Sequence, residues 1–527
     1  MLKRITLLIL AFSSFNFASP NIPSKADLNI LIVVDGLRPD LINPNDTPNM
    51  YALKHTGVYY ENSHAVFPTV TRVNSAAIAS AAYPEKNGIV SNSMYVPSID
   101  PSHSFNTKNY KLLIELEKQT DGGLFQCKTA AQHFTAAGKK FVGISSGSTG
   151  TSFLLNHKAV NGAGVVINGY FEEGKRVAFP DSVSDAILEK IGPAPDLTGL
   201  SCYDIKVNWT TKVLTDYVLP ELKPDVVFFW ITEPDRTQHG AGIGSPETTE
   251  TIINADKNIG AVLQKVKDLG LGERANIFVV SDHGFGTYKY SINVTEELIN
   301  VGLKESKDSD DVVLASSGQS VLLHVKDRNM EKIKNIVSFL QMQDWTGVLF
   351  TAASLQSPSK VYGWVDGTFS LELIHQPSTG RGADIILTFP WTSEKNKWDF
   401  PGMEVSATNG KSGARNGTSA GHGSMSPWTI RNTMIASGVD FKTGISTKVP
   451  GCSIDFTATI LALQGAELDK DVQGRIISEA LKTGPDSEKV PYETKIYTQE
   501  LENSTNYIQI SKVGNYWYVD KSWRSEK

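Results

Sequence analysis

Short apolar runs recur along the chain, and several of them end in polar residues. Three of these runs cover residues 28–34, 226–231 and 277–280. A run of this kind is typical of a strand buried on both faces of a parallel sheet, with a polar side chain at its carboxyl end. A fourth run, 385–389, has the same pattern without a polar motif after it. Because ligands bind at the carboxyl ends of such strands, the pattern predicts a site where the first three runs end.

Helical patterns lie between the apolar runs, for example at residues 75–82, 181–191 and 250–267. This alternation predicts an α/β fold with three layers, in which helices cover a mostly parallel sheet. Later in the chain, the pattern predicts a further strand at 433–437 and a helix at 454–463.

The regions that break this alternation suggest the domain organisation. Residues 306–410 contain stretches rich in Gly, Ser, Pro and Trp, and we expect them to form an inserted, cap-like region near the active site. The catalytic core is then expected in two parts, 20–305 and 411–490. Residues 491–527 are rich in β-forming residues around an expected turn at 513–515, which predicts a β-rich C-terminal tail.

The first residues have the pattern of a secretory signal. Lys3 and Arg4 precede an apolar run at 5–12, and small and polar residues follow through Ser19. The apolar run is too short to span a bilayer, and no later segment has a transmembrane pattern. We therefore expect residues 1–19 to be a signal peptide and the mature protein to be secreted or periplasmic.

Composition narrows the possible partners. The chain has 527 residues, of which 40% are hydrophobic and 20% charged, and its net charge is -6. These values are ordinary for a folded enzyme and give no basic surface for a nucleic-acid polymer, so such binding is not expected. Three cysteines allow at most one intrachain disulfide.

The polar residues after the apolar runs, together with a late His-Gly, have side chains that bind zinc: Asp35, Asp235, His239, Asp282, His283 and His422. Catalytic zinc sites use three protein ligands and keep one position open. We expect Asp235, His239 and His422 to form one site. The other three would form the second site, with a Thr71 hydroxyl in its fourth position. Two such metals suit an in-line displacement at phosphorus, which predicts phosphoryl-transfer chemistry.

Thr71 is the candidate nucleophile, because a nearby metal can activate a threonine hydroxyl. The Asn92 amide and the backbone N–H after the nucleophile are candidate donors to a phosphate oxygen. A purely structural interpretation is also open, in which Thr69 caps the following helix and Thr71 only fills its first turn.

In their order, these motifs resemble those of the alkaline phosphatase superfamily, and more closely its nucleotide pyrophosphatase/phosphodiesterase branch. The resemblance runs from about residue 29 to 465 and includes the stretch 83–90 between nucleophile and asparagine. It implies an alkaline-phosphatase-like core with two zinc ions. Carried over residue by residue, it implies a nucleophile at Thr71, a phosphate-binding asparagine at Asn92, and metal ligands at Asp35, Asp235, His239, Asp282, His283 and His422.

The chain departs from the family pattern beside the nucleophile. Val70, Arg72 and Val73 stand where nucleotide-cleaving members often have Lys, Phe and Pro. A preference for nucleotides is therefore left open. Arg72 is a candidate for binding a second anionic group of the substrate, with a surface ion pair as the alternative. Lys158 is a further, weaker candidate for contacting the substrate.

The predicted function is that of a secreted two-zinc phosphodiesterase or nucleotide pyrophosphatase, which hydrolyses phosphodiester or phosphoanhydride bonds through a covalent phosphothreonine. Its expected substrate is a small-molecule phosphate ester. The alternatives are a phosphomonoesterase or phosphonate hydrolase of the same superfamily, or a secreted binding protein without turnover. The sequence leaves the natural substrate and the oligomeric state open.

Overall fold

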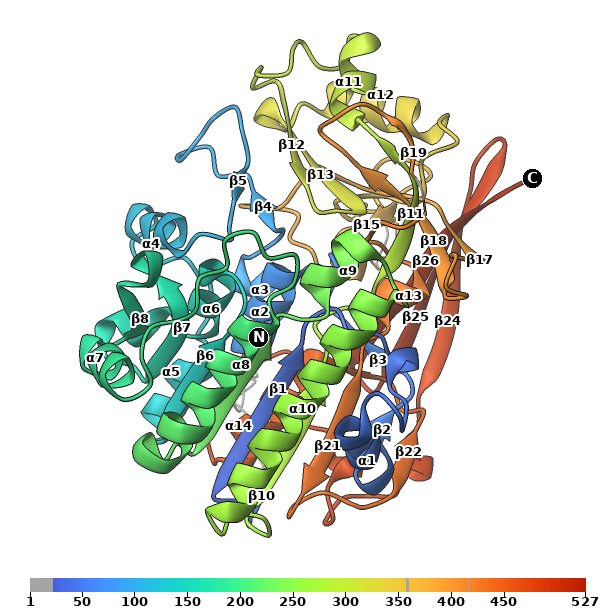
Figure 1. The fold of residues 1–527 in the computed structure, drawn as a ribbon. Coiled ribbons are helices and arrows are strands. Elements are labelled where there is room, and N and C mark those ends of the chain that lie inside the picture. The colour runs from blue at the N-terminus through green and yellow to red at the C-terminus, as the bar shows by residue number, and fades with distance from the viewer. Residues whose placement is uncertain (1–21, 357–359, 416) are drawn as a thin grey trace, which may run out of the picture.

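A nine-stranded sheet forms the centre of the protein (Figure 1). The computed structural model describes residues 22–356, 360–415 and 417–527, so the predicted signal peptide at 1–19 lies outside the described residues. The strand order is β22-β2-β21-β10-β1-β9-β6-β7-β8. Their bounds are β1 (Leu28–Val34), β2 (Val58–Tyr60), β6 (Phe141–Ser145), β7 (Val165–Phe171), β8 (Arg176–Phe179), β9 (Val226–Ile231), β10 (Ala275–Val280), β21 (Met434–Gly438) and β22 (Ile445–Thr447).

The middle of this sheet is parallel, as predicted. β1 pairs in parallel with both β9 and β10, and β6 pairs in parallel with β9 and β7. β21 and β8 are antiparallel to their neighbours β10 and β7. The three predicted strands that precede polar motifs are therefore adjacent, and their carboxyl ends meet at one edge of the sheet.

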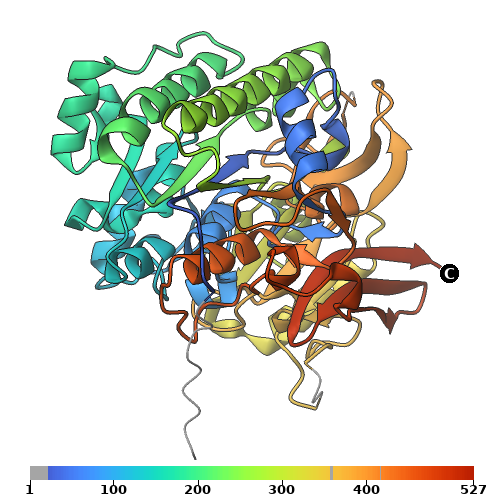
Figure 2. The ribbon, with the colours of Figure 1, turned by 90° about the horizontal axis from the view of Figure 1, so that it is seen from below.

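Helices cover both faces of the sheet (Figures 1 and 2). One side carries α1 (Pro48–Thr56), α8 (Asp204–Val213) and α10 (Pro246–Asp268), and the other carries α2 (Thr71–Ser80), α5 (Ala130–Ala136), α6 (Thr149–Leu155) and α14 (Ser453–Leu463). Along β1, Ile30 and Ile32 pack in the apolar cluster that includes Ile252 of α10, whereas Leu31 packs in the cluster that includes Phe456 of α14. Because both faces of the strand are buried, its sequence is apolar at nearly every position.

The region after α11 (Val294–Asn300) forms a second sheet. Its strand order is β12-β13-β16-β14-β15, and α12 (Met330–Gln341) follows β13 in the chain. The run predicted at 385–389 is β16 (Ile385–Thr388), which lies in this sheet and not in the central one. The strand bounds are β12 (Val312–Ser316), β13 (Ser320–Val325), β14 (Leu349–Thr351) and β15 (Phe369–Ser370). A third sheet pairs β11 (Gly286–Ile292) with β18 (Pro401–Ala407), β19 (Gly413–Ala414) and β20 (Ala420–Gly421), and β18 also with β17 (Trp391–Lys395).

The C-terminal tail is β-rich, as predicted. β24 (Glu493–Glu500), β25 (Ser504–Val513) and β26 (Tyr516–Glu526) form an antiparallel sheet, and the expected turn at 513–515 joins the last two strands. This sheet packs against the region of α12, where Arg524 donates to the Gln341 carbonyl oxygen over 3.0 Å (Figure 2).

The helix that contains the candidate nucleophile begins earlier than predicted. α2 covers Thr71–Ser80, whereas the pattern predicted 75–82. Val70 before it is extended, with φ -130° and ψ 151°, and no side chain caps the helix, so the usual capping signal is missing. Thr71 is therefore the first helical residue.

Three further observations complete the fold. All three cysteines, Cys127, Cys202 and Cys452, are unpaired. Within the described ranges, no helix combines the length and apolarity needed to cross a membrane. The remaining elements are β3 (Ser63–His64), α3 (Pro84–Asn87), β4 (Ser93–Met94), β5 (Phe105–Asn106), α4 (Tyr110–Gln119), α7 (Asp181–Lys190), α9 (Asp235–Ala241), α13 (Pro427–Ile430), β23 (Gly451–Cys452), a π-helix at Leu214–Leu222 that continues α8, and short 3₁₀ helices.

Candidate metal centre and its cavity

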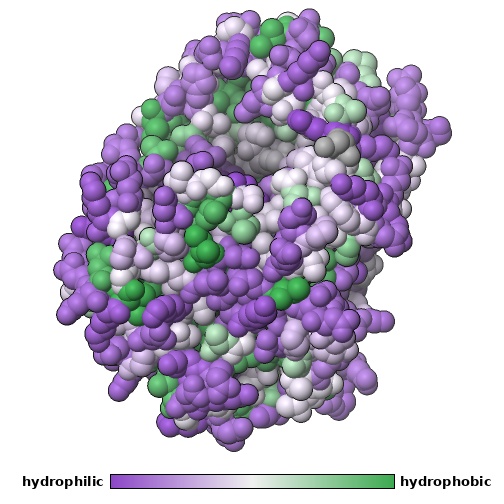
Figure 3. Space-filling model, viewed as in Figure 1, coloured by the Kyte–Doolittle hydropathy of each residue, from purple (hydrophilic) through white to green (hydrophobic). Residues whose placement is uncertain are grey.

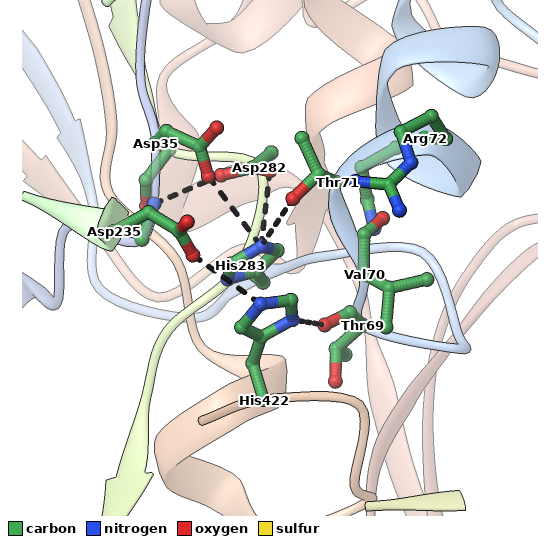
Figure 4. Close-up of polar contacts among 12 residues, drawn as sticks. Asp35, Thr69, Val70, Thr71, Arg72, Asp235, Asp282, His283 and His422 are labelled. Atoms are coloured by element: carbon green, nitrogen blue, oxygen red, sulfur yellow. Dashed lines mark hydrogen bonds and ion pairs between the residues drawn. The ribbon is translucent and has the colours of Figure 1, made fainter. Parts of the chain in front are cut away.

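The six candidate ligands come together at the carboxyl edge of the central sheet. Figure 4 labels five of them, Asp35, Asp235, Asp282, His283 and His422. Asp35 follows β1 directly, Asp282 and His283 follow β10, and Asp235 is the first residue of α9 after β9. His239 lies one helical turn beyond Asp235, on the same face of α9. The sixth, His422, follows β20.

Three ligand atoms of the first predicted site form a nearly regular triangle. Asp235 Oδ1 lies 3.4 Å from His239 Nε2 and 3.2 Å from His422 Nε2, and the two imidazole nitrogens are 3.3 Å apart. Around a tetrahedral zinc ion with ligand distances of about 2.0 Å, ligand atoms lie about 3.3 Å apart. The spacing therefore fits zinc. His239 is 39% exposed, so this site opens toward solvent.

The second predicted site is fully buried. His283 Nε2 lies 3.1 Å from Asp282 Oδ2, 3.6 Å from Asp35 Oδ1 and 3.4 Å from Thr71 Oγ1. The Thr71 hydroxyl thus takes the place expected of a fourth ligand or bound nucleophile, and Figure 4 shows it turned toward His283.

Hydrogen bonds to the carboxylates leave one oxygen of each aimed into the centre. Asp35 Oδ2 accepts from the Trp230 indole over 2.9 Å, and Asp282 Oδ1 accepts from the Gly36 backbone N–H over 3.0 Å. Asp35 Oδ1, Asp282 Oδ2 and Asp235 Oδ1 are buried and accept no hydrogen bond from a fixed N–H or O–H among the described residues; their polar neighbours are imidazole Nε2 atoms at 3.1 to 3.6 Å. Unpartnered buried carboxylate oxygens are costly unless a cation binds them, so the residues fit a metal centre.

The imidazoles are oriented in the same way. The Nδ1 atoms of His239, His283 and His422 lie 2.9 to 3.0 Å from the backbone carbonyl oxygens of Ala420, Gly284 and Thr69. An N–H donated at Nδ1 leaves the lone pair of Nε2 free to bind a metal. All three Nε2 atoms face the centre.

The pKa shifts of the buried carboxylates also indicate that cations bind at the centre. Burial raises the pKa of Asp35 well above its ordinary value, and the carboxylates of Asp282 and Asp235 raise it further. Burial alone would also raise the pKa of Asp235, but His239 and His422 beside it lower that pKa well below its ordinary value. Three carboxylates this close together are stable as anions only with positive charge between them.

Thr69 has a different role from the cap that the structural interpretation proposed. Its hydroxyl accepts from the Gly423 N–H over 3.0 Å and donates to the Ser424 carbonyl oxygen over 3.0 Å. It therefore fixes the loop that carries His422, and it does not cap α2. Of the two threonines, only Thr71 contacts a candidate ligand with its hydroxyl.

Asn92 contacts α2, the helix that begins at the candidate nucleophile Thr71. Its side-chain oxygen accepts from the Arg72 backbone N–H over 2.9 Å. This N–H, which we expected as a donor to a phosphate oxygen, is therefore already bonded. The bond holds the Asn92 side chain at the first turn of α2, close to Thr71.

A cavity of about 680 Å³ adjoins the centre, and Asp35, Thr71 and Asp235 are part of its wall. The space-filling view shows a hollow next to residues 306–410 (Figure 3), but the residues that line this cavity all lie before residue 240. Arg72 also lines the cavity, and its Nε is buried without a hydrogen-bond partner within the described ranges. Burial lowers the pKa of Arg72 to about 10, although the nearby carboxylates oppose this shift.

Lys158 is the one candidate that the structure does not bring to the centre. Its ammonium forms an ion pair with Glu117, and it is not part of the cavity wall. Conversely, sequence reasoning missed Trp230 and the cavity residues Tyr170, Tyr203 and Lys206. They come from separate elements, and no motif connects them, so only the fold could reveal them.

Part of the stretch 306–410, which the sequence predicts as an insertion, contacts this site. The Gln319 backbone N–H donates to the His422 carbonyl oxygen over 3.2 Å, and the hydroxyls of Ser91 and Ser317 are hydrogen-bonded over 2.5 Å. The segment between β12 and β13 therefore packs directly against the loop of His422 and the residue before Asn92.

Comparison with known proteins identifies the family. The model of the family described as type I phosphodiesterase / nucleotide pyrophosphatase matches residues 29–346, more than half of the chain. The chain belongs to this family. Within it, the ectonucleotide pyrophosphatase/phosphodiesterase family member 1 of Mus musculus is 24% identical over 274 residues, which are 50% of this chain and 25% of the mouse protein.

Other members of the type I phosphodiesterase family are similarly distant. Venom phosphodiesterase 2 of Crotalus adamanteus is 26% identical over 258 residues, which are 48% of this chain and 26% of the venom protein. The match thus spans about a quarter of the length of these two curated relatives.

Solved structures share the fold. Murine ectonucleotide pyrophosphatase / phosphodiesterase 5 superposes with a TM-score of 0.58 at 15% identity, over 86% of this chain and 100% of that chain. An inactive form of the murine protein in complex with AMP gives a TM-score of 0.55 at 15% identity, over 84% of this chain and 95% of that chain. These likenesses confirm the predicted α/β core of the alkaline phosphatase type.

Proposed function

We propose that this type I phosphodiesterase family member is a two-zinc hydrolase that cleaves phosphodiester or phosphoanhydride bonds of small molecules. The observation that carries the proposal is a pair of adjacent ligand groups. One contains Asp35, Asp282 and His283, with the Thr71 hydroxyl 3.4 Å from His283, and the other contains Asp235, His239 and His422. Their spacings of 3.1 to 3.6 Å suit tetrahedral zinc. Family membership supports the reaction class.

Zinc bound at the two sites would neutralise charge on the phosphoryl oxygens and lower the pKa of a bound hydroxyl or water. Asp35, Asp282 and His283 would hold one ion, and Asp235, His239 and His422 the other. Thr71 Oγ1 would form a bond to phosphorus while the leaving oxygen departs with its electron pair and takes up the proton that Thr71 has lost. Water would then break the phosphothreonine bond, returning a proton to Thr71 and releasing a phosphate monoester.

Two residues beside Thr71 would position the substrate. The Asn92 amide, fixed at the start of α2 by its bond to the Arg72 N–H, would donate to a phosphoryl oxygen. Arg72 lines the cavity with an unpartnered Nε, so its guanidinium is available to an anionic group of the substrate.

Several finer statements belong to the same proposal. We propose nucleotides as one substrate class, in view of the AMP complex of the murine relative. We also propose that residues 1–19 are removed as a signal peptide and that the protein acts outside the cytoplasm, in line with the ecto- and venom enzymes among its relatives. The core at 20–305 and 411–490, the cap-like insertion at 306–410 and the tail at 491–527 are the proposed domains.

The proposal is tested by comparing hydrolysis of a nitrophenyl nucleotide diester and of nitrophenyl phosphate by the zinc-loaded chain. We expect a preference for the diester that Thr71→Ala abolishes. The matched control is Thr71→Ser, which keeps a hydroxyl at the same position and should retain much of the rate. A preference for the monoester would favour the phosphomonoesterase alternative, and no turnover of either ester would favour a binding protein.

A further inference from the structure

A buried lysine lies in the wall of the active-site cavity. Lys206, on α8, is only 6% exposed, and its Nζ donates to the Gly147 carbonyl oxygen over 2.7 Å. The ring centroids of Tyr170 and Tyr203 lie 4.4 and 5.7 Å from Nζ. No ion pair between Lys206 and a carboxylate is found in the part of the chain that the structure describes. The ammonium is thus enclosed by aromatic rings and one carbonyl group.

A buried ammonium without a counter-ion is unfavourable. Burial lowers the pKa of Lys206 to about 7, and no neighbouring carboxylate offsets this effect. A bond to the Gly147 carbonyl oxygen alone does not require a charge, because any neutral donor of similar length could make it. The bond to Gly147 therefore does not compensate the charge of the buried ammonium.

Outside the candidate metal centre, the wall of the cavity around Lys206 carries more cationic than anionic side chains. Thr71 and Lys206 line the same space of about 680 Å³, a volume that suits a small organic molecule. Apart from the two candidate ligands Asp35 and Asp235, its charged residues are five cations against two carboxylates: Arg72, Lys108, Lys111, Lys206 and Arg236 against Glu172 and Glu173. An anionic substrate group would gain more at the buried Lys206 than at a solvent-exposed cation, because solvent screening is weaker there.

We propose that Lys206 binds a second phosphate group of the substrate, remote from the phosphorus that reacts. The site would then select phosphodiesters that carry such a group. This inference rests on the proposed function, since it assumes that the cavity receives a phosphate ester. A compact ammonium pairs well with phosphate as a point charge, and phosphate binding would supply the counter-ion that the protein itself does not provide.

Direct binding measurements test the proposal without turnover. Calorimetry on the zinc-loaded full chain would compare adenosine 5′-monophosphate with adenosine 2′,5′-bisphosphate and 3′,5′-bisphosphate. These ligands differ only in the second phosphate. We expect at least one bisphosphate to bind about 10- to 100-fold more tightly than the monophosphate, the range of a charge-assisted hydrogen bond.

Two variants at Lys206 separate its charge from its hydrogen bond. Lys206→Gln keeps a donor for the Gly147 carbonyl oxygen, and Lys206→Met removes both. Both should lose the advantage of the bisphosphate while binding the monophosphate within about threefold of the wild type. Lys212→Met is the matched control, because Lys212 is on the same helix but is 55% exposed and paired with Asp216; it should keep the advantage.

The outcomes are distinguishable. Equal affinity for all three ligands in the wild type would overturn the proposal, as would a bisphosphate advantage that survives in Lys206→Gln. Failure of the wild type to hydrolyse any phosphodiester would instead contradict the proposed function and leave the binding comparison readable. Loss of the advantage in Lys206→Gln, with thermal stability unchanged, would support the role of the charge.

Discussion

Replacing Trp230 with phenylalanine tests how the buried carboxylate of the centre is held. The Trp230 indole donates to Asp35 Oδ2 over 2.9 Å, and this bond turns the unpartnered Oδ1 toward His283. Trp230→Phe keeps an aromatic ring in the core but removes the donor. Asp35 then has a buried oxygen without a partner and more freedom to turn away from the metal.

The size of the effect follows from the bond that is lost. A hydrogen bond to a charged group contributes about 1.5 to 3 kcal/mol, so about 2 kcal/mol corresponds to a roughly 30-fold weaker metal affinity. Similar losses are typical when a group that orients a metal ligand is removed. We therefore expect the dissociation constant for zinc at the site of Asp35, Asp282 and His283 to rise about 10- to 100-fold. Activity at saturating zinc should fall much less.

Zinc titration by calorimetry with a competing chelator would measure this change. Trp209→Phe is the matched control, because Trp209 is also buried in the core but donates to the Gly192 carbonyl oxygen over 3.3 Å and is not part of the centre. Both variants lose similar apolar area, so this part of the loss in thermal stability should be similar, and Trp230→Phe should lose more because it also leaves Asp35 Oδ2 without a donor. An unchanged zinc affinity in Trp230→Phe, or an equal loss in Trp209→Phe, would refute the reasoning.

Three further predictions concern other parts of the account. Asn92→Ala should lower kcat/KM by about 10² to 10³, because the lost amide donates to a phosphoryl oxygen of the substrate. Zinc affinity measured by calorimetry should stay unchanged, since Asn92 contacts no candidate metal ligand, and weaker zinc binding would contradict this. Removing zinc with a chelator should lower the Tm. Adding zinc at about 1,000 times its dissociation constant should raise the free energy of unfolding by about 4 kcal/mol, and an unchanged Tm would argue against a metal centre. Lys206→Met should stabilise the protein below pH 7 by about 2 kcal/mol. A folded pKa of about 7 against an ordinary 10.5 costs about 5 kcal/mol there, and the loss of the bond to Gly147 in the variant offsets part of the gain. That gain should shrink as the pH rises from 7 to 10.5, where the folded and then the unfolded lysine lose their protons, and a variant that is less stable than the wild type at pH 6 would contradict the reasoning.

Much of the core could be predicted from local pattern, because burial on both faces leaves a clear mark on a strand. The runs at 28–34 and 226–231 are β1 and β9 with the predicted bounds. The start of α2 could not be predicted, since no capping residue precedes Thr71 and the signal for a helix appears only in the alanine-rich stretch after it. The run at 385–389 was correctly predicted as a strand but belongs to a different sheet, because an apolar run does not specify its partners.

Some residues of the candidate site could likewise be predicted from the sequence, and others could not. The six candidate ligands could be named from the sequence because each follows a strand or belongs to a short motif, and the structure brings them together. Lys158 could not be judged from the sequence, because its position depends on the ion pair with Glu117, which is 41 residues away in the chain. Trp230 and Lys206 were missed for the opposite reason. Each looks like an ordinary residue of its strand or helix, and its contacts with Asp35 or the cavity exist only in the folded chain.

The stereochemical course at phosphorus is the measurement that tests the central claim most directly. A phosphorothioate diester of known configuration would be hydrolysed in isotopically labelled water by the zinc-loaded chain. Each in-line displacement inverts the configuration at phosphorus, so attack by Thr71 followed by attack of water predicts overall retention. Overall inversion would mean that water attacks the diester directly, and it would contradict the role of Thr71 as a covalent nucleophile.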